Sequence, residues 1–387
     1  MREIASFSKL STKHLCAFIG FVAVAHVLRR ETKKAVSAAL SAGVTVRMIT
    51  GDHFETAYHI GTQLGMVTDR SQVFDCRKMG VLSDAKLETI IQDIRIFSRV
   101  IPEHKHRILG LLKKNNITAM TGDGVNDVPA LVNAHVGVAM GSGSQIAKDA
   151  GDIILLDDDF KSIIDAMREG RIIFSNIRRM LFYLLSTNAG EVLTALGALV
   201  IGMPIPLVPV QILWVNLVTD TSMVIPIGLE PGEKNVMKLR PKKPDAPILS
   251  TFMISRIVLV ALTMAALTLT LYVIYSNLYG VAYGRTIAFG ALVVMQWANA
   301  FNARSDYQSL LGRLKVVNLH FYAGLTIAVT LQMMALFGPL QSVLHVAAVS
   351  IGDLFVTGII SFATLIIVVE IHKFIGRHFY HSPNMIK

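Results

Sequence analysis

Six long apolar segments follow Arg179 and leave this chain few possible folds outside a membrane. Each segment is close to the roughly 20 residues that an α-helix needs to cross a bilayer. The composition agrees, because 52% hydrophobic residues in 387 is too apolar for an ordinary soluble protein. We therefore expect a lipid bilayer around six transmembrane helices, at about residues 181–203, 207–229, 254–276, 286–303, 319–338 and 351–373.

Positive charges predict the orientation of these helices. The loops after the second and fourth segments are basic, and so is the tail at 375–387, whereas the alternate loops carry little positive charge apart from Arg285. Basic loops remain on the cytoplasmic side. We thus expect a multi-pass integral membrane protein whose soluble part and carboxyl terminus are cytoplasmic. The net charge of +10 serves this orientation, and no nucleic-acid partner is expected.

Residues 1–180 differ from the rest of the chain, since short β-branched runs alternate there with amphipathic stretches. This alternation is typical of a doubly wound parallel sheet, whose functional groups lie at the carboxyl ends of its strands. We predict strands at 18–24, 44–49, 117–120, 136–140 and 152–155, and helices at 31–42, 53–64, 84–94 and 104–114.

The apolar run at 15–25 has a second interpretation. It follows Arg2, Lys9 and Lys13, as the hydrophobic region of a secretory signal peptide would. We favour a buried strand, because a helical pattern and a stop at Gly43 follow it.

Two short strings place acidic residues directly after predicted strands. Thr50-Gly51-Asp52 follows the strand at 44–49, and Thr121 to Leu131, with Asp123 and Asp127, follows the strand at 117–120. Turn glycines and backbone N–H groups at a helix start suit phosphate, and paired carboxylates suit Mg²⁺. The sequence therefore predicts magnesium and phosphate chemistry at this edge of the sheet.

The string from Thr121 to Leu131 closely resembles the hinge motif of P-type cation-transporting ATPases of type II, the calcium-pump-like group. The resemblance implies a haloacid-dehalogenase-like fold and the use of ATP and Mg²⁺. Asp123 then corresponds to the Mg²⁺ ligand and Asp127 to its supporting carboxylate. Thr50, Gly51 and Asp52 would contact the phosphoryl group, and Lys105 would balance its charge.

Part of the family pattern does not occur in these 387 residues. No Asp-Lys-Thr-Gly-Thr string is present to supply the phosphorylated Asp, and Arg29 alone matches the family's Asp-Pro-Pro-Arg hinge. The resemblance covers almost the whole chain but only about two-fifths of such a pump. We therefore expect an incomplete parallel sheet in residues 1–180 and no independent covalent step.

Polar residues recur at helical spacing inside the apolar segments. Glu191 and Asp220 are the acidic residues among them. Burying an ionisable group in a bilayer costs free energy, so such residues usually have a function or an ionic partner. The amides and hydroxyl that share their faces are Asn188, Asn216, Thr219, Gln296 and Asn299. The resemblance implies that all seven coordinate the transported cation. Hydrogen bonding between helices is the alternative.

Gln296 stands where the calcium pump of sarcoplasmic reticulum has a Glu, which leaves calcium, sodium or a proton-coupled variant open. The favoured function is that of a fragment of an ATP-driven cation pump, which a separate amino-terminal half that carries the phosphorylated Asp would complement. The alternative is a non-catalytic membrane subunit or a truncated product without ATPase activity of its own. The enzyme assignment stays open between them.

Overall fold

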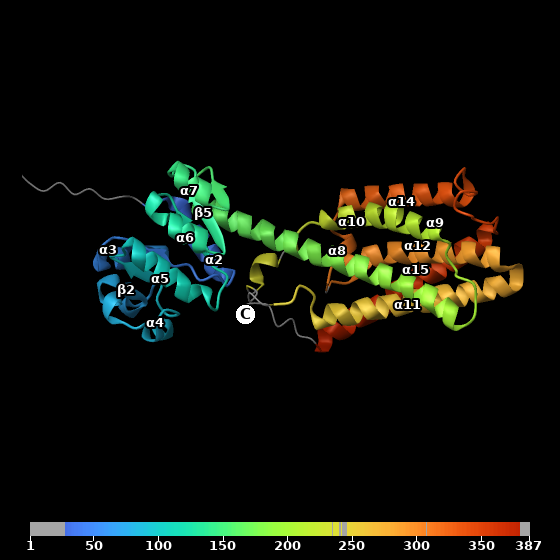
Figure 1. Ribbon diagram of the computed structural model, residues 1–387, viewed down its shortest axis with the longest axis horizontal. Coiled ribbons are helices and arrows are strands. Elements are labelled where there is room, and N and C mark those ends of the chain that lie inside the picture. Colours follow the sequence, from blue (N-terminus) through green and yellow to red (C-terminus); the bar gives the residue numbers. More distant parts are fainter. Residues whose placement is uncertain (1–27, 234, 240, 242–245, 307, 380–387) are drawn as a thin grey trace, which may run out of the picture.

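The computed structural model describes residues 28–233, 235–239, 241, 246–306 and 308–379. Figure 1 shows an α/β part and a helical part that are joined by one long helix, α8 (Phe160–Val200). The sequence predicts a division at residue 180, which falls within α8. The predicted strand at 18–24 lies outside the described residues.

From residue 28 onward, where the structure describes the chain, the α/β part contains two parallel sheets of three strands each. The first has the order β1-β3-β2 and the second the order β4-β5-β6. The strands are β1 (Met48–Ile49), β2 (Val73–Asp75), β3 (Ile96–Ser98), β4 (Ala119–Gly122), β5 (Val136–Met140) and β6 (Ile153–Leu155). Strands β1 and β4 are therefore edge strands, one in each sheet. The prediction of an α/β fold with an incomplete parallel sheet is confirmed.

Among the residues that the structure describes, six helices pack around these sheets. They are α2 (Arg30–Ser41), α3 (Phe54–Leu64), α4 (Asp84–Ile90), α5 (Pro102–Lys113), α6 (Val128–Asn133) and α7 (Gln145–Ala150). Local signals set several of their ends. Gly65 ends α3 in a left-handed conformation, at φ 73°, that glycine tolerates best. The Ser83 side chain accepts a hydrogen bond from the Lys86 N–H and so caps the start of α4.

The core of the first sheet is centred on β3. Ile96 and Phe97 point to opposite faces of this strand, and each is completely buried in a different hydrophobic cluster. Strand β3 pairs with β1 at Met48 and with β2 at Val73, so it holds the sheet together.

The second predicted transmembrane segment is one helical rod of three pieces. It consists of α9 (Pro209–Trp214), a π-helical turn η4 (Val215–Asp220) and α10 (Thr221–Gly228). A π turn inserts an extra residue into the helix and often marks a functional site. Here it carries three of the predicted cation-site residues, namely Asn216, Thr219 and Asp220.

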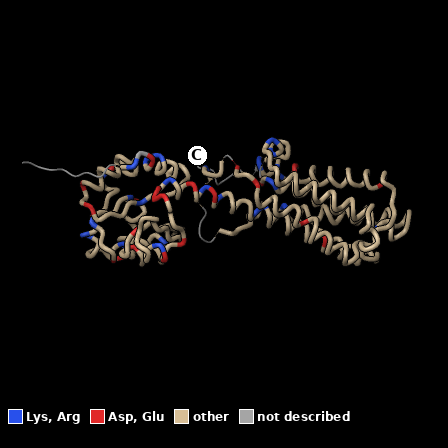
Figure 2. The backbone as a smooth tube through the Cα atoms, turned by 90° about the horizontal axis from the view of Figure 1, so that it is seen from above, with Lys and Arg blue, Asp and Glu red and all other residues tan. Residues whose placement is uncertain are grey.

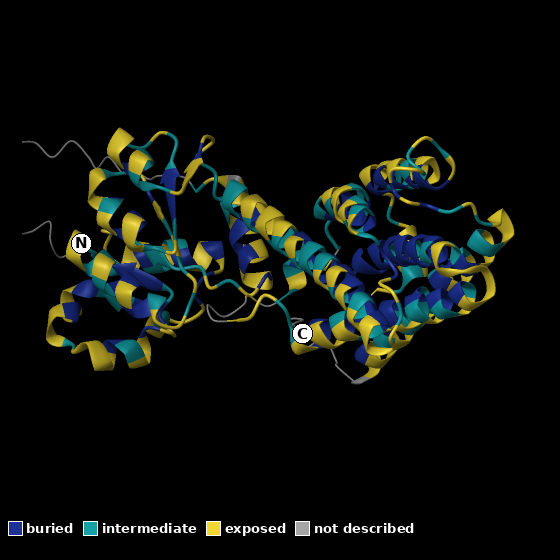
Figure 3. Cartoon of the chain, turned by 45° about the vertical axis from the view of Figure 1, so that its right-hand side comes forward, coloured by how far each residue is buried: buried dark blue, intermediate teal, exposed yellow. Residues whose placement is uncertain are grey.

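The remaining helices complete the bundle. They are α11 (Thr251–Tyr279), α12 (Val281–Ala303), the short α13 (Leu310–Leu314), α14 (Leu319–Phe337) and α15 (Ile351–Phe379). Helix α12 packs against α8, α11 and α15, while α14 packs mainly against α10. Figure 3 shows buried residues gathered in the centre of this part and exposed ones on its outer surface.

Within the described residues, four helices are long and apolar enough to cross a membrane, namely Pro209–Gly228, Thr251–Tyr279, Leu319–Phe337 and Ile351–His378. The first and fourth predicted segments form helices as well, in α8 and α12. These two helices carry buried polar residues, such as Glu191 and Gln296, which lower the mean hydropathy of their apolar segments. Their crossing of the bilayer stays a prediction.

Charged residues are unevenly distributed. Figure 2 shows Lys, Arg, Asp and Glu throughout the α/β part and at the end of the helical part nearest to it. Glu230, which is 1% exposed, lies at this end and accepts hydrogen bonds from Arg304, Arg313 and Asn318. These bonds tie the segment after α10 to the segment between α12 and α14.

Candidate functional site

The turn after β4 brings two acidic residues to the carboxyl edge of the second sheet. Strand β4 ends at Gly122, and a 3₁₀ turn, η3 (Val125–Asp127), leads into α6. A Cβ atom at position 122 would lie 2.4 Å from the Asp127 Cβ, so only glycine fits there. The turn thereby holds Asp127 beneath the backbone of residues 123 and 124.

Asp127 is a buried carboxylate with a defined set of donors. It accepts a hydrogen bond from the Lys105 ammonium group. It also accepts hydrogen bonds, at 3.3 Å each, from the backbone N–H groups of Asp123 and Gly124. Burial alone would raise the pKa of Asp127, but the hydrogen bond and charge of Lys105 outweigh burial and hold that pKa below its usual value. The Asp127 carboxylate is therefore ionised at neutral pH.

Asp123 is exposed, in contrast to Asp127. Its backbone oxygen accepts the Ser144 N–H at 2.8 Å, and a Cβ at position 143 would lie 2.6 Å from the same oxygen. The loop before α7 thus fixes the Asp123 backbone, while the carboxylate stays accessible.

Thr50, Gly51 and Asp52 follow β1. The Thr50 hydroxyl donates to Asp52 Oδ2 at 2.8 Å, and the Asp52 N–H donates to Thr50 Oγ1. The Val100 N–H donates to the Thr50 carbonyl at 3.0 Å, which anchors this loop just before α5, the helix of Lys105. Within the described residues, no side-chain hydrogen bond joins the Thr50 loop to the Lys105 and Asp127 pair.

The donor set at these strand ends fits Mg²⁺. Magnesium in proteins is commonly held by one or two carboxylates, with waters and substrate phosphates completing the octahedron. Asp123 offers an accessible carboxylate, and Asp127 supports its backbone from below. Lys105 lies beside them as the cation that a phosphoryl group would need.

The second group of predicted residues lies in the helical part. The Glu191 carboxylate of α8 accepts a hydrogen bond from the Gln296 amide of α12 at 2.8 Å and another from the Asn216 amide of η4 at 3.2 Å. Asp220 of η4 accepts the Tyr183 hydroxyl of α8 at 3.0 Å. Both acids are nearly buried, at 7% and 2% exposure, so three helices converge on two carboxylates.

Several oxygens in this group have no hydrogen-bond donor among the described residues. They are Asp220 Oδ2, Gln296 Oε1 and Asn299 Oδ1, while the Asn299 amide nitrogen donates to Ser186 Oγ at 2.8 Å. Buried polar atoms are nearly always satisfied, so this shortage of donors calls for a cation or water. Within the same part of the chain, no three His, Cys, Asp or Glu residues gather to hold a metal ion, so amide oxygens would have to contribute.

Not every predicted residue joins the group. Thr219 is buried on η4, but Asn188 is exposed on α8 and makes no side-chain hydrogen bond that involves the described residues of the site. Asn216 is also exposed, although it reaches Glu191. The side of the group that bears Asn188 and Asn216 is therefore open.

Sequence reasoning missed Tyr183 and Ser186. Tyr183 lies eight residues before Glu191, two helical turns away on the same face of α8, and Ser186 lies one turn after Tyr183. Helical spacing from Glu191 was thus a usable signal. The hydrogen bonds to Asp220 and Asn299 depend on how α8 packs against η4 and α12, which the sequence does not reveal.

Comparison with known families covers both parts of the chain. The family described as "Cation transporting ATPase, C-terminus" matches residues 204–375. The family described as "haloacid dehalogenase-like hydrolase" matches residues 7–135. One match thus falls in the α/β part and the other in the helical part.

Named relatives agree with these matches. The chain is 37% identical over 330 residues to a calcium-transporting ATPase of Bacillus subtilis, which covers 84% of this chain and 37% of that protein. It is 36% identical to calcium-transporting ATPase 1 of Bacillus cereus, over 87% of this chain and 40% of the relative.

A plant protein is similar as well. An endoplasmic reticulum-type calcium-transporting ATPase 3 of Arabidopsis thaliana is 32% identical over 93% of this chain and 40% of its own length. The chain therefore spans about two-fifths of the length of these relatives. With its apolar helices, it is an integral membrane protein, and it belongs to the family of cation-transporting P-type ATPases.

Proposed function

We propose that this chain supplies the cation-binding helices and the Mg²⁺-binding part of the phosphorylation site of an ATP-driven pump for calcium or a related cation. The observation that carries the proposal is the convergence of Glu191, Asp220 and Gln296 from three helices, with two of their oxygens lacking a donor. Carboxylate and amide oxygens in such numbers suit a hard cation.

The ion would enter a site that is already assembled on one side. Asp220, Gln296 and Asn299 offer oxygens directly, while Glu191 provides further ones after its amide partners rearrange. The open side, with Asn188 and Asn216, leaves room for ligands from other helices. Calcium is the first candidate, since the relatives are named calcium-transporting ATPases.

In the α/β part, we propose that Asp123 holds Mg²⁺ and that Asp127 and Lys105 fix the geometry around it. Bound Mg²⁺ would neutralise charge on a phosphoryl group transferred from ATP. Thr50 would donate its hydroxyl to that group, and Lys105 would offset its charge. The exposure of Asp123 and the ion pair beside it support this role.

We further propose that all six long helices cross the bilayer and that the α/β part faces the cytoplasm, where ATP and Mg²⁺ are found. The basic residues Arg304 and Arg313 lie at the end of the bundle nearest the α/β part, which agrees with cytoplasmic placement.

A separate amino-terminal half is the proposed partner for the covalent step. Edge strands β1 and β4 each end just before residues of the proposed phosphate site, and each has one side without a strand partner among the described residues. A strand ending in a nucleophilic Asp would pair with such edges. Phosphorylation by ATP of a mixture of this chain and the amino-terminal part of a relative tests this, with each part alone as control.

Calcium binding tests the central proposal. Isothermal titration of the purified chain in detergent should show Ca²⁺ binding that Asp220→Asn weakens about tenfold or more, which corresponds to about 1.4 kcal/mol. Asp353→Asn is the matched control, since Asp353 lies at the start of α15 and accepts from Tyr283. Equal affinities for the chain and both variants would refute the proposal.

A further inference from the structure

The π turn η4, which carries part of the proposed cation site, lies between two contacts with α14. Just before the turn, the Trp214 indole N–H donates to Gln332 Oε1 at 3.0 Å, and Gln332 is 2% exposed. Just after the turn, a Cβ atom at Gly324 would lie 2.4 Å from the carbonyl oxygen of Ser222. Only glycine therefore lets α14 approach the rod this closely, and the two contacts bracket the turn.

The contact after the turn involves a weakened part of the rod. Pro226 lies inside α10 and has no N–H group, so it cannot donate to the Ser222 carbonyl as a helical residue ordinarily would. This carbonyl faces Gly324 of α14. Asn318, at the start of α14, also donates to the Pro226 carbonyl at 3.3 Å. Helix α14 thus supports the rod where its own hydrogen bonding is interrupted.

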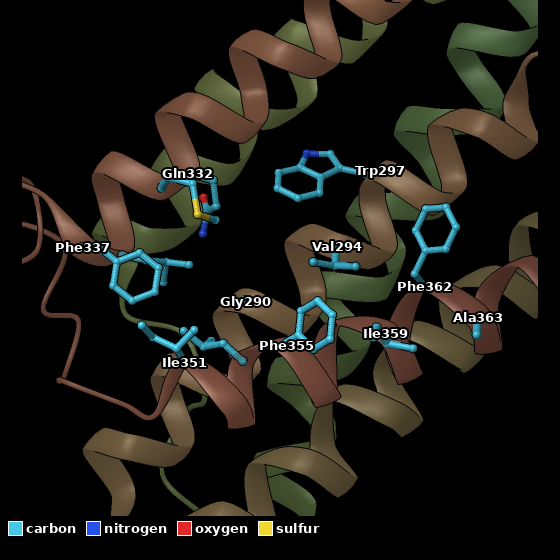
Figure 4. A pocket seen from close by; sticks show the side chains of 14 residues that line it. Gly290, Val294, Trp297, Gln332, Phe337, Ile351, Phe355, Ile359, Phe362 and Ala363 are labelled. Atoms are coloured by element: carbon cyan, nitrogen blue, oxygen red, sulfur yellow. The ribbon is translucent and has the colours of Figure 1, made fainter.

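Helix α14 has much less support on its other side. It packs mainly against α10, and a groove of about 460 Å³ lies between α14, α12 and α15. Figure 4 shows this groove with Gln332 and Phe337 on one side and Phe355 and Ile359 on the other. Helix α14 and the rod therefore form a pair, whereas the other acid of the proposed site, Glu191, belongs to α8.

The two contacts with α14 favour the π form of the turn. A π turn contains one extra residue, and an α-helix advances by about 100° per residue. Conversion of η4 to a regular α-helix would thus rotate Trp214 by about 100° relative to Ser222. The two residues could then no longer both face α14.

The form of the turn also decides which side chains meet in the proposed cation site. Asn216, near the start of the turn, donates to Glu191, and Asp220, at its end, accepts from Tyr183. The rotation described above would move Asn216 relative to Asp220 by the same angle. Both hydrogen bonds to α8 can therefore form together only while the turn keeps its extra residue.

We propose that α14 is the template that holds η4 in its π form, and that Gln332 is the positioning residue of this template. Gln332 acts through Trp214 and does not contact the ion. Its effect on cation binding rests on the proposed function, whereas its effect on the turn does not.

Hydrogen–deuterium exchange tests the template without any cation. In the full chain in detergent, Gln332→Met removes the acceptor but keeps much of the side-chain volume, so the N–H groups of residues 215–220 should exchange faster than in the wild type. Gln332→Glu still presents an acceptor oxygen and should restore the wild-type rate. Tyr283→Phe is the matched control, because it removes a hydrogen bond to Asp353 between α12 and α15 and should leave exchange at 215–220 unchanged.

Fluorescence reports the same hydrogen bond, because the chain has only two tryptophans. In a Trp297→Phe background, Trp214 is the sole reporter. Its emission should shift to shorter wavelength in Gln332→Met, since the indole N–H loses its acceptor. The shift should be absent in Gln332→Glu and in Tyr283→Phe.

Titration with Ca²⁺ measures the consequence for the cation site. Gln332→Met should weaken Ca²⁺ binding about fivefold, which corresponds to about 1 kcal/mol, and Trp214→Phe should have a similar effect. The double variant should lose no more than either single variant, because both substitutions remove the same bond.

Exchange at the wild-type rate in Gln332→Met would overturn the inference, as would a loss of Ca²⁺ affinity that Gln332→Glu or Tyr283→Phe reproduces. Faster exchange at residues 215–220 in Gln332→Met, in a chain that binds no Ca²⁺, would support the template and refute the proposed function instead.

Discussion

Gln296 on α12 donates its amide nitrogen to the Glu191 carboxylate on α8 at 2.8 Å, across 105 residues of sequence. The same amide leaves its oxygen without a donor among the described residues. The amide thus holds the carboxylate with one end and offers a ligand atom with the other. Where a Glu would repel Glu191, Gln296 stabilises it.

The amide at position 296 should limit the affinity for divalent cations. Gln296→Glu adds a third carboxylate to the group, so Ca²⁺ affinity should rise about tenfold or more, while Gln296→Met should lower it. Titration with Ca²⁺ and with Na⁺ measures both changes. A Glu variant whose Ca²⁺ affinity stays at the wild-type value would show that Gln296 does not face the ion.

The two acids should act on one ion. Glu191→Gln and Asp220→Asn should each lower cation affinity about tenfold or more, and the double variant should lose less than the sum of the two effects in free energy. A shared site explains this, because a single substitution already disrupts coordination of the same ion. Calorimetry on the chain, alone and with the amino-terminal part of a relative, provides the cycle. Strict additivity would indicate two separate structural roles.

Much of the architecture was readable from sequence because its signals are local. Strand β5 was predicted with its observed bounds, Val136–Met140, from a β-branched run next to turn residues. Strand β3 was missed, because its three residues Ile96–Ser98 become a strand through pairing with β1 and β2, which are distant in sequence. Patterns within a short window contain no information about such pairing.

The proposed cation site shows the same division. Glu191 and Asp220 were found from the cost of acids in apolar segments, which depends on single helices. Asn188 shares the helical spacing of Glu191 but is exposed, and Tyr183 was overlooked although it donates to Asp220. Which residues of a face meet a partner is decided by the packing of α8 on its neighbours, not by spacing alone.

The chain by itself should not form a phosphoenzyme. Its 387 residues contain no Asp-Lys-Thr-Gly-Thr string, and the groups around Asp123, which we propose to hold Mg²⁺ beside a phosphoryl group, do not provide the family's nucleophile. Incubation with γ-labelled ATP and Mg²⁺, followed by an acid gel, checks this. A labelled band that hydroxylamine removes would contradict the prediction.

The α/β part should be the less stable part of the molecule. Its described strands form two small parallel sheets with β1 and β4 at their edges, and such short sheets bury less apolar surface than one larger sheet covered on both faces. Limited proteolysis of the whole chain in detergent should therefore cleave within residues 28–159 before it cleaves the helices that follow. First cleavage in the loops between α11 and α15, with the α/β part intact, would count against it.

The ion pair of Lys105 and Asp127 should stabilise the α/β part in a pH-dependent way. Asp127→Asn removes the charge but keeps the shape, and loss of a charged hydrogen bond in a buried position should cost about 1.5–3 kcal/mol near neutral pH. Asp149→Asn, at an exposed position on α7, is the matched control and should cost little.

The direction of the pH dependence follows from the lowered pKa of Asp127. A carboxyl group whose pKa is lower in the folded state stabilises that state above its unfolded pKa, near about 3.9, and loses this contribution as pH falls through the folded value. Thermal melting of the α/β part should therefore show a constant gap between wild type and Asp127→Asn from pH 7 to about pH 5 and a shrinking gap below about pH 4. A gap that widens on acidification would mean that Asp127 is protonated in the folded chain and that Lys105 does not hold it ionised.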